Sequence, residues 1–545
     1  MDKKPNVLIL LADQQRWDTI NYLGNSHMIT PNLDRLAKEG CSYVNAHTPN
    51  PLCMPARHCL LTGLQEIFHG YYVNRNKPIK DYNIPTIPRI FSENGYRTAA
   101  IGKMHFYPVR SHHGFNELQL MEEVPRHCQD DAYMSYLKNT GYGNIQNLHG
   151  VRPHVYHVPQ MSQVPARHHG TFWLSRQVIN WLKNNEDNPF FLMASWIQPH
   201  PPWNIPEEYL DLYKQRSLPE PEGISRLPFN KESEYDWYGD REPEALKKSV
   251  RQSYYTSITM VDKAIGNILD YLERTKQIDN TLVIFTSDHG EMLQDKGYYC
   301  KKLPYDGSVR IPMIVRYPEI FTQDIVNESF TDLYDIMPTC LDICNIAYPE
   351  SEVYKPSGCS LRNEGVLKNR KYQISSCGNE NIYNSRWVMC RDRKYKYIYH
   401  YNQAYEELYD LEKDPGETVN FLSKGPPHPA KWEELRKQVR QFESKNAPFE
   451  PGPDNNLKKF DHGLFSPDIH GKYHYWMNLQ MHRSDKREKK QRAEQFIREI
   501  KQALSNKKHS IVSLSEVFND PEWIDNLLKN WQQYGEGNEL QDLLL

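Results

Sequence analysis

The chain has 545 residues, of which 39% are hydrophobic and 12% aromatic, so it can bury a substantial core and global disorder is excluded. Its formal net charge is −3, which argues against the strongly basic surface that nucleic-acid binding usually requires. No apolar run approaches the roughly 18 residues that a membrane-spanning helix needs. We therefore expect neither a nucleic-acid partner nor a membrane partner.

The ten cysteines are too sparse for a disulfide-stabilised scaffold, and no CxxC pair occurs. The first apolar run lacks the small-residue cleavage site of a signal peptide, because it ends in Ala12-Asp13-Gln14-Gln15-Arg16. We interpret this run as a buried strand. The expected location is cytoplasmic for the chain as numbered, or periplasmic or secreted if a signal peptide was removed.

The first elements in chain order predict an α/β architecture. Residues 7–12 form a continuous apolar run of strand length, as expected for a central strand that is covered on both faces. Thr30, a typical N-cap residue, and Pro31 then open a helical pattern over residues 31–37. A second buried strand is predicted at residues 189–195.

The clearest helix–strand unit lies at residues 258–286. Six apolar residues recur there at helical spacing: Ile258, Val261, Ile265, Ile268, Leu269 and Leu272. After a turn, residues 281–286 predict a buried strand, and Asp288 and His289 follow its end, as Asp13 follows the first apolar run. Ligands bind at the carboxyl ends of strands in open α/β sheets, so Asp13 and Asp288 are predicted to converge at one edge of one sheet.

The pattern changes after about residue 375. Residues 387–389 and 395–399 predict strands of a separate small sheet, and residues 432–442 predict an amphipathic helix. Beyond residue 450, two apolar helical stripes need a partner surface, either the main domain or another subunit. We therefore predict a main domain (1–375), a small-sheet subdomain (376–450) and a helical extension (451–545) through which a homo-oligomer could form.

One segment carries the strongest chemical signal. It reads Cys53-Met54-Pro55-Ala56-Arg57 and continues as Leu60-Leu61-Thr62-Gly63. A cysteine near a proline is weak evidence by itself, because most cysteines are small buried hydrophobes. The complete string C-x-P-x-R with L-x-T-G is far more specific, and it resembles the signature of the type I sulfatases of the alkaline-phosphatase-like superfamily. In that family a maturation enzyme that reads the proline and the arginine converts the cysteine to formylglycine.

Further segments resemble the family's motifs and occur in the family's order, so the resemblance covers about residues 5 to 425. These segments are residues 6–13, 95–98 with 102–105, 189–191 leading to 198–202, 286–291, Lys301 ahead of 305–306 and 310–312, and 407–411 with 414–417. They resemble, in turn, the opening strand with its metal-binding aspartate, the second signature, the strand before the catalytic histidine, the late metal-binding element, the active-site lysine and the C-terminal subdomain.

The resemblance implies an alkaline-phosphatase-like α/β/α sandwich with a smaller C-terminal α+β subdomain and a helical extension. The catalytic residues it implies are Cys53, Arg57, Lys103, His105, His200 and Lys301. The metal ligands it implies are Asp13, Gln14, Cys53 as formylglycine, Asp288 and His289. One divalent metal is expected, with Ca²⁺ as the first choice and Mn²⁺ or Mg²⁺ as alternatives.

These residue types also suit ester cleavage when the family is set aside. Cleavage of a sulfate or phosphate ester must stabilise charge on the non-bridging oxygens and on the departing oxygen. Two carboxylates can hold a hard cation, three basic side chains add positive charge, and two imidazoles can move protons near neutral pH. In the family mechanism, hydrated formylglycine attacks sulfur, His200 with Lys301 protonates the leaving alcohol, and His105 removes the proton that lets sulfate depart.

Two positions depart from the commonest pattern of the family. Gln14 stands where many sulfatases have a second aspartate, and His289 stands where asparagine is frequent. Both changes resemble the branch that contains phosphonate monoester hydrolases and choline sulfatases. They remove an anionic ligand and add an imidazole, which suits Mn²⁺ or a similar ion better than an all-oxygen site does.

The favoured function is hydrolysis of a sulfate ester, on a sulfated carbohydrate, with release of inorganic sulfate. The alternatives are a phosphonate monoester or phosphodiester hydrolase, or a choline-sulfatase-like enzyme, that uses the same nucleophile. An inactive sulfatase-fold binding module is the alternative outside enzymes. The expected partners are a small-molecule or saccharide sulfate ester and the formylglycine-generating maturation enzyme.

Overall fold

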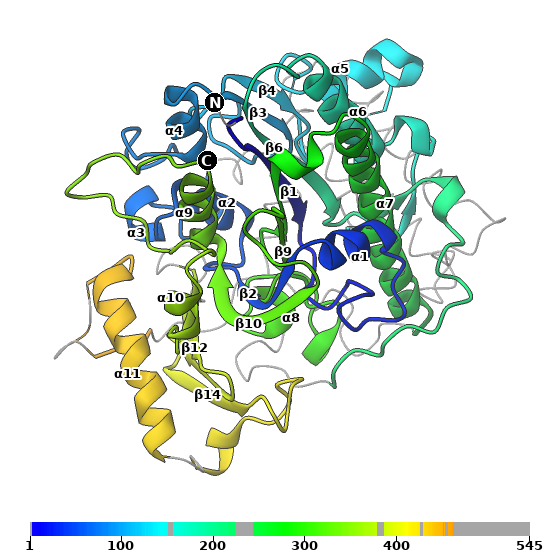
Figure 1. The fold of residues 1–545 in the computed structure, drawn as a ribbon. Helices are drawn as coiled ribbons and strands as arrows, with labels where there is room; N and C mark the ends of the chain where they lie inside the picture. Colours follow the sequence, from blue (N-terminus) through cyan, green and yellow to red (C-terminus); the bar gives the residue numbers. More distant parts are fainter. Residues whose placement is uncertain are drawn as a thin grey trace, which may run out of the picture.

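The computed structural model describes residues 3–125, 127–145, 147–150, 156–223, 244–378, 386–425, 429–450, 452 and 456–460. Its central feature is an eight-stranded sheet with the order β10-β2-β9-β8-β1-β6-β3-β4 (Figure 1). The strands are β1 (Asn6–Asp13), β2 (Cys41–His47), β3 (Arg97–Gly102), β4 (Glu117–Leu120), β6 (Phe190–Pro199), β8 (Thr281–Ser287), β9 (Met313–Arg316) and β10 (Ile325–Asp332).

Strand β1 lies at the middle of this sheet and is buried along its whole length. It pairs in parallel with β6 and β8, and Leu8 lies in register with Leu192 and Val283. A strand that is covered on both faces needs apolar side chains at successive positions, which explains the continuous apolar runs. The strands predicted within residues 7–12, 189–195 and 281–286 are confirmed. Strand β9 runs antiparallel to both of its neighbours, which the sequence did not indicate.

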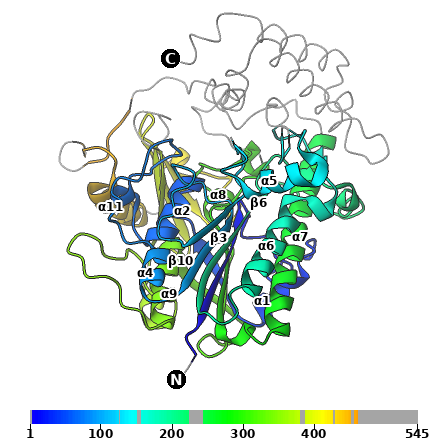
Figure 2. The ribbon, with the colours of Figure 1, turned by 90° about the horizontal axis from the view of Figure 1, so that it is seen from above.

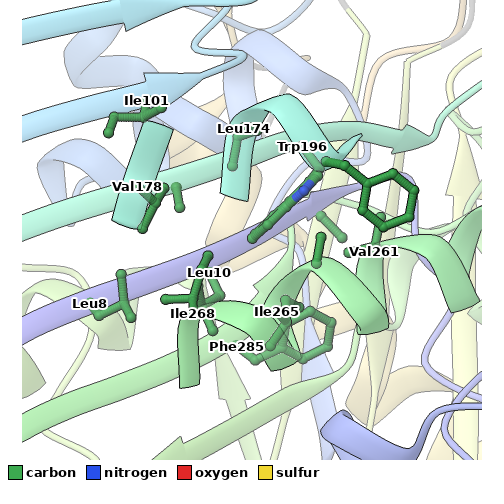
Figure 3. Packing of buried hydrophobic residues seen from close by; sticks show 14 of the residues in the cluster. Leu8, Leu10, Ile101, Leu174, Val178, Trp196, Val261, Ile265, Ile268 and Phe285 are labelled. Atoms are coloured by element: carbon green, nitrogen blue, oxygen red, sulfur yellow. The ribbon is translucent and has the colours of Figure 1, made fainter. Parts of the chain in front are cut away.

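Helices cover both faces of the sheet, so the predicted α/β/α sandwich is confirmed (Figure 2). One face is covered by α1 (Pro31–Lys38), α6 (Gly170–Lys183) and α7 (Glu244–Arg274), and the other by α2 (Cys53–Thr62), α4 (Ile87–Glu93) and α9 (Ile336–Ile343). Because side chains alternate along a strand, Leu8 and Leu10 pack towards Val178 of α6 and Ile268 of α7 (Figure 3). Val7, Ile9 and Leu11 belong to the core on the opposite face.

Around this sheet lie several short elements. They include the two-stranded pairing of β5 (Gln160–Met161) with β7 (Asn204–Ile205) and the helices α3 (Glu66–His69), α5 (Ala132–Leu137), α8 (Asp306–Val309) and α10 (Glu364–Lys368). In the described part of the chain, the helices are too short or too polar for any to cross a membrane.

Helix α1 begins at Pro31 with Thr30 at the N-cap, as predicted, but the Thr30 side chain makes no capping bond. Its hydroxyl donates instead to Asp34 Oδ1 over 2.9 Å. The first backbone N–H groups of the helix are accepted by Asp262 of α7, from Leu33 over 2.7 Å and from Asn32 over 3.0 Å. A distant carboxylate thus supplies the acceptor that the local sequence was expected to provide.

A second, four-stranded antiparallel sheet follows the main domain. Its strands are β11 (Gln373–Cys377), β12 (Trp387–Arg391), β13 (Tyr395–His400) and β14 (Tyr405–Asp410), and helix α11 (Pro429–Asn446) packs against it (Figure 1). The predicted small sheet and amphipathic helix are confirmed, while the domain boundaries at residues 375 and 450 stay predictions. The helices predicted beyond residue 460 lie outside the described residues.

Polar contacts join this small sheet to the main domain. Asp306, the first residue of α8, accepts from Lys396 Nζ at 2.8 Å and from Arg391 at 3.0 Å. The Trp387 indole N–H donates to the carbonyl of Lys302 over 2.6 Å. Both contacts hold the segment around residues 301–306, which carries Lys301, against the subdomain.

A buried carboxyl group at the first residue of α3, that of Glu66, makes a testable contribution to stability. Glu66 is 2% exposed, and burial raises its pKa from the usual 4.5 to about 7. Its folded-state pKa lies above its unfolded value, so the stability it contributes is complete below about pH 4.5 and is lost as the pH rises through about 7. We expect Glu66→Gln to leave stability nearly unchanged at about pH 4.5 and to raise the free energy of unfolding by on the order of 2 kcal/mol at about pH 8.

Urea unfolding of both proteins at the two pH values measures this difference. Glu93→Gln, a change at an exposed glutamate of α4, is the matched control and should have little effect at either pH. An equal stability difference for Glu66→Gln at both pH values would contradict a neutral buried carboxyl group.

Candidate active site

Four neighbouring parallel strands end at one edge of the large sheet, and each delivers a polar residue there. In the order β8, β1, β6 and β3, these residues are Asp288, Asp13, His200 and Lys103. Asp13 is the last residue of its strand, and the other three follow the last strand residue directly. The predicted convergence of Asp13 and Asp288 is observed, because parallel pairing brings the carboxyl ends of these strands together.

Cys53 lies at this edge as the first residue of α2 and is 1% exposed. Its Sγ atom is 3.4 Å from Lys301 Nζ, 3.7 Å from Lys103 Nζ and 3.3 Å from His289 Nε2. Burial by itself would raise the pKa of the Cys53 thiol, but Lys103, Lys301 and His289 outweigh burial and hold that pKa well below its usual value. The partial positive charge of a helix N-terminus acts in the same direction. Position 53 therefore favours a negatively charged group.

Arg57 follows Cys53 by one helical turn, which places both on the same face of α2. Its guanidinium donates to Asp288 Oδ2 over 2.8 Å and to Asp13 Oδ2 over 3.1 Å. It also donates to the Ser195 hydroxyl and to the Lys103 carbonyl. All three charged side chains are buried, so the arginine of the C-x-P-x-R string serves here to neutralise and orient the two carboxylates.

A cluster suited to a metal ion lies beside Cys53. One ligand atom each from Asp13, Cys53, Asp288 and His289 lies within 4.8 Å of the others. His289 Nδ1 is 3.0 Å from the Gly290 carbonyl, to which it donates, so the Nε2 lone pair of the neutral ring faces the cluster, as in metal-ligating histidines. Burial would lower the pKa of His289, but Asp288 and Cys53 outweigh burial and raise it. The cluster thus favours positive charge at Nε2, supplied by a proton or by a metal ion.

Asp13 is held ionised within the same cluster. Burial and Cys53 oppose its ionisation, but the positive charges of Lys103 and Arg57 outweigh them and keep the pKa of Asp13 below its usual value. Its Oδ1 is 3.7 Å from His289 Nε2, and its Oδ2 accepts from Lys103. An anionic oxygen therefore faces the imidazole that could share a cation with it.

Gln14 lies next to this cluster, and its side chain bridges two other groups. Its Oε1 atom accepts from Lys301 Nζ over 2.6 Å, and its Nε2 atom donates to Glu291. The amide oxygen is therefore at the edge of the cluster and bonded to an ammonium group. Its assignment as a metal ligand stays a prediction.

The two predicted proton carriers, His105 and His200, both lie close to the carboxylate of Glu123. Ligand atoms of His105, Cys53 and Glu123 lie within 4.8 Å of one another. His200 Nε2 is 3.8 Å from Glu123 Oε1, and its Nδ1 donates to the Pro201 carbonyl over 2.6 Å. That bond leaves Nε2 directed at the site, so both imidazoles can reach a group bound at residue 53.

The neutral form of His200 is the stable one in this arrangement. Burial and the ammonium of Lys301 lower the pKa of His200 well below its usual value. The Tyr156 hydroxyl lies 3.5 Å from His200 Nε2, where it can donate to the unprotonated nitrogen. An anion bound between His200 and Lys301 would reverse the balance and favour the imidazolium.

The structure brings all the predicted site residues to one place and adds three that the sequence analysis missed. Glu123 accepts from Lys103, and Tyr156 faces His200. Both lie in loops without a readable pattern, so no sequence signal could have found them. Glu291 was part of the 286–291 segment, but the motif gave no indication that its carboxylate binds Gln14.

Known protein families match most of this chain. The sequence profile of the family described as "Sulfatase" matches residues 5–346. The chain belongs to the sulfatase family. A second profile, "N-sulphoglucosamine sulphohydrolase, C-terminal", matches residues 294–445, which include the small sheet and α11. The resemblance inferred from the motifs is therefore confirmed, and the family makes the chain a sulfuric ester hydrolase.

Individual relatives span most of this sulfatase. An arylsulfatase of Clostridium perfringens is 31% identical over 451 residues, which cover 77% of this chain and 90% of the relative. An N-acetylglucosamine-6-O-sulfatase of Bacteroides thetaiotaomicron is 24% identical over 509 residues, covering 81% and 86%. Among solved structures, the phosphonate monoester hydrolase of Agrobacterium radiobacter has the same fold, with a TM-score of 0.67, 24% identity and coverage of 81% and 96%.

Proposed function

We propose that this sulfatase hydrolyses a sulfate ester of a carbohydrate, using formylglycine made from Cys53 and one divalent cation. The observation that carries the proposal is the position of Cys53. It lies at a helix N-terminus between Lys103, Lys301 and the Asp13–Asp288–His289 cluster, so a nucleophile at residue 53 would meet both the anion-binding cations and the metal ligands.

The residues at the cluster fit a divalent cation. Asp13, Asp288 and His289 would hold it, with residue 53 and Gln14 completing the donor set. Two carboxylates and an amide oxygen favour Ca²⁺ and also suit Mg²⁺, while the imidazole keeps Mn²⁺ as an alternative. When bound, the cation would withdraw charge from a sulfate oxygen and make a hydroxyl of residue 53 more acidic.

The chain's own residues then account for the reaction. One hydroxyl of hydrated formylglycine would lose its proton to solvent and attack sulfur, and the bond from sulfur to the ester oxygen would break. His200, with Lys301 beside it, gives a proton to the departing alcohol. His105 removes the proton of the second hydroxyl, the bond between the residue's carbon and the sulfate oxygen breaks, and sulfate leaves. The aldehyde remains and adds water before the next turnover.

Lys103 and Lys301 supply the positive charge that this path needs at residue 53, while Arg57 neutralises Asp13 and Asp288. Lys103 and Lys301 approach Cys53 from different elements, one after β3 and the other in the loop before α8. Fixed cations in a buried site stabilise charge on the sulfate oxygens at little reorganisation cost. The carbohydrate is proposed because a relative covering 81% of this chain is named an N-acetylglucosamine-6-O-sulfatase.

A phosphonate monoester hydrolase is the second candidate, because Gln14 and His289 depart from the commonest sulfatase pattern and a hydrolase of that kind shares the fold. Both substrates are monoanions, so the charge of the site does not separate them. We expect kcat/KM for aryl and sugar sulfates to exceed that for an aryl phosphonate monoester by about tenfold or more. Parallel rate measurements test this, with Cys53→Ala as the control for contaminating activity. A phosphonate preference would overturn the sulfatase assignment of the substrate.

A further inference from the structure

Glu291 is a buried carboxylate, fully shielded from solvent, that lies two residues beyond His289. Its Oε2 atom accepts from the side-chain amide of Gln14. Its Oε1 atom accepts from the backbone N–H of Leu293 over 3.0 Å and of Cys300 over 2.5 Å. One carboxylate therefore connects the residue that follows β1 with both ends of the 293–300 loop.

The chemistry of the two neighbours determines how the Gln14 amide points. A lysine ammonium can only donate, and both Glu291 oxygens act as acceptors here, Oε1 for two backbone N–H groups and Oε2 for the Gln14 amide. The Gln14 oxygen must therefore face Lys301 Nζ, at 2.6 Å, and the Gln14 nitrogen must face Glu291. The opposite orientation would place two donors together and two acceptors together, so Glu291 and Lys301 jointly select the end of the amide that is presented to the site.

The Gln14 backbone is also held in an uncommon conformation. Its φ is +68°, in the left-handed region that few residues other than glycine adopt. Its N–H donates to Asp288 Oδ1 over 3.1 Å, and its carbonyl accepts from the Tyr254 hydroxyl over 2.7 Å. With the backbone fixed in this way, the amide orientation is still free to change, and the contacts with Glu291 and Lys301 fix it.

The same carboxylate fixes the approach of Lys301. The loop after Glu291 turns back so that Met292 N–H donates to the Cys300 carbonyl over 2.7 Å, and Glu291 accepts the Cys300 N–H from the other side of the turn. Lys301 is the next residue, and its Nζ atom lies 3.4 Å from Cys53 Sγ. The position of the ammonium thus depends on a backbone bond to Glu291 and on a side-chain bond to Gln14.

We propose that Glu291 is a positioning residue that aims the Gln14 amide oxygen and the Lys301 ammonium at residue 53. It touches neither the substrate nor the nucleophile, and it acts through these two side chains. This role rests on the proposed function, in which Lys301 assists His200 in protonating the leaving alcohol. Loss of Glu291 should therefore affect substrates unequally. A misplaced Lys301 would slow hydrolysis mainly of esters whose leaving alcohol needs a proton.

The test compares Glu291→Gln with the double variant Gln14→Glu/Glu291→Gln. In the single variant, the new amide nitrogen faces the Gln14 nitrogen, so two donors meet and Gln14 must turn or shift. In the double variant, the residue 291 amide oxygen still accepts the two backbone N–H groups, and its nitrogen donates to the carboxylate at position 14. That carboxylate can accept from Lys301, so each hydrogen bond regains a donor and an acceptor while the net charge is unchanged.

We expect Glu291→Gln to lower kcat/KM on a sugar or alkyl sulfate by about tenfold to a hundredfold, and on 4-nitrocatechol sulfate, with its good leaving group, by less than about threefold. The double variant should regain most of the loss on the alkyl sulfate. Asp262→Asn, which removes a buried carboxylate that caps α1, is the control and should lower stability without changing the ratio of the two rates.

Each outcome bears on one conclusion. Equal losses on both substrates in Glu291→Gln, or no recovery in the double variant, would overturn the positioning role and leave Glu291 as a structural residue. A wild-type protein without activity on either sulfate would overturn the proposed function instead. Thermal unfolding of each variant shows whether the rates refer to folded protein.

Discussion

Replacing Cys53 by alanine should lower sulfate release by on the order of a thousandfold or more, because the site then has no nucleophile while its cations and carboxylates remain. The side chain is buried at the first position of α2, and alanine is tolerated there, so the fold should persist. Turnover of an aryl sulfate measures the loss, and circular dichroism checks the fold. Cys53→Ser should also be inactive unless the host can mature serine.

The mass of the peptide that spans residue 53 distinguishes formylglycine from an unmodified thiolate. Conversion of the thiol to an aldehyde makes the peptide that spans residue 53 about 18 Da lighter than its sequence requires. Mass spectrometry of active wild-type protein should show this loss. Full activity in protein whose residue 53 carries the thiol mass would refute the proposed nucleophile, since the low pKa of Cys53 would then favour a thiolate mechanism.

Replacing Arg57 by alanine should lower the free energy of unfolding by about 3 to 5 kcal/mol, because it leaves two buried carboxylates without their shared partner. Arg57 contacts Asp13 and Asp288 at 3.1 and 2.8 Å, and all three side chains are at most 1% exposed. Denaturant unfolding in the presence of a chelator measures the loss, because a bound cation would replace part of the missing positive charge.

Arg35→Ala is the matched control for this change. Arg35 pairs with Asp270 at the surface, at 2.9 Å with 29% and 63% of the side chains exposed, and exposed pairs contribute at most about 1 kcal/mol. A loss below about 1 kcal/mol for Arg57→Ala would contradict its role in neutralising the two aspartates.

The sequence predicted much of the fold, because the signals that it used are local. Residues 7–12 and 281–286 are continuous apolar runs, and such runs suit strands that are covered on both faces. The C-x-P-x-R string is likewise local, because Cys53 and Arg57 lie within five consecutive residues, and the structure places both on one face of α2. Asp13 and Asp288 were identifiable because strand ends in such sheets are where ligands bind, whereas Lys103 and His200 were implied by the resemblance to the sulfatases.

Other features could not be predicted, since they depend on residues far apart in the chain. The N–H groups at the start of α1 are accepted by Asp262, which lies some 230 positions away, so Thr30 is not needed as a capping side chain. The antiparallel direction of β9 follows from how the chain returns to the sheet. Glu123 reaches Lys103 from a loop with no periodic pattern.

By itself, the sequence determined which chemical groups this sulfatase has and which short segments carry them. Examples are the ends of the strands and the segment that contains Cys53 and Arg57. Only the tertiary structure decided how these groups face one another. Gln14 shows the difference, because its amide has two chemically distinct ends, and the end that faces the site depends on Glu291 and Lys301, each more than 270 residues away. Periodicity specifies which side of an element is buried, but the orientation of a polar side chain depends on the donors and acceptors that packing brings to it.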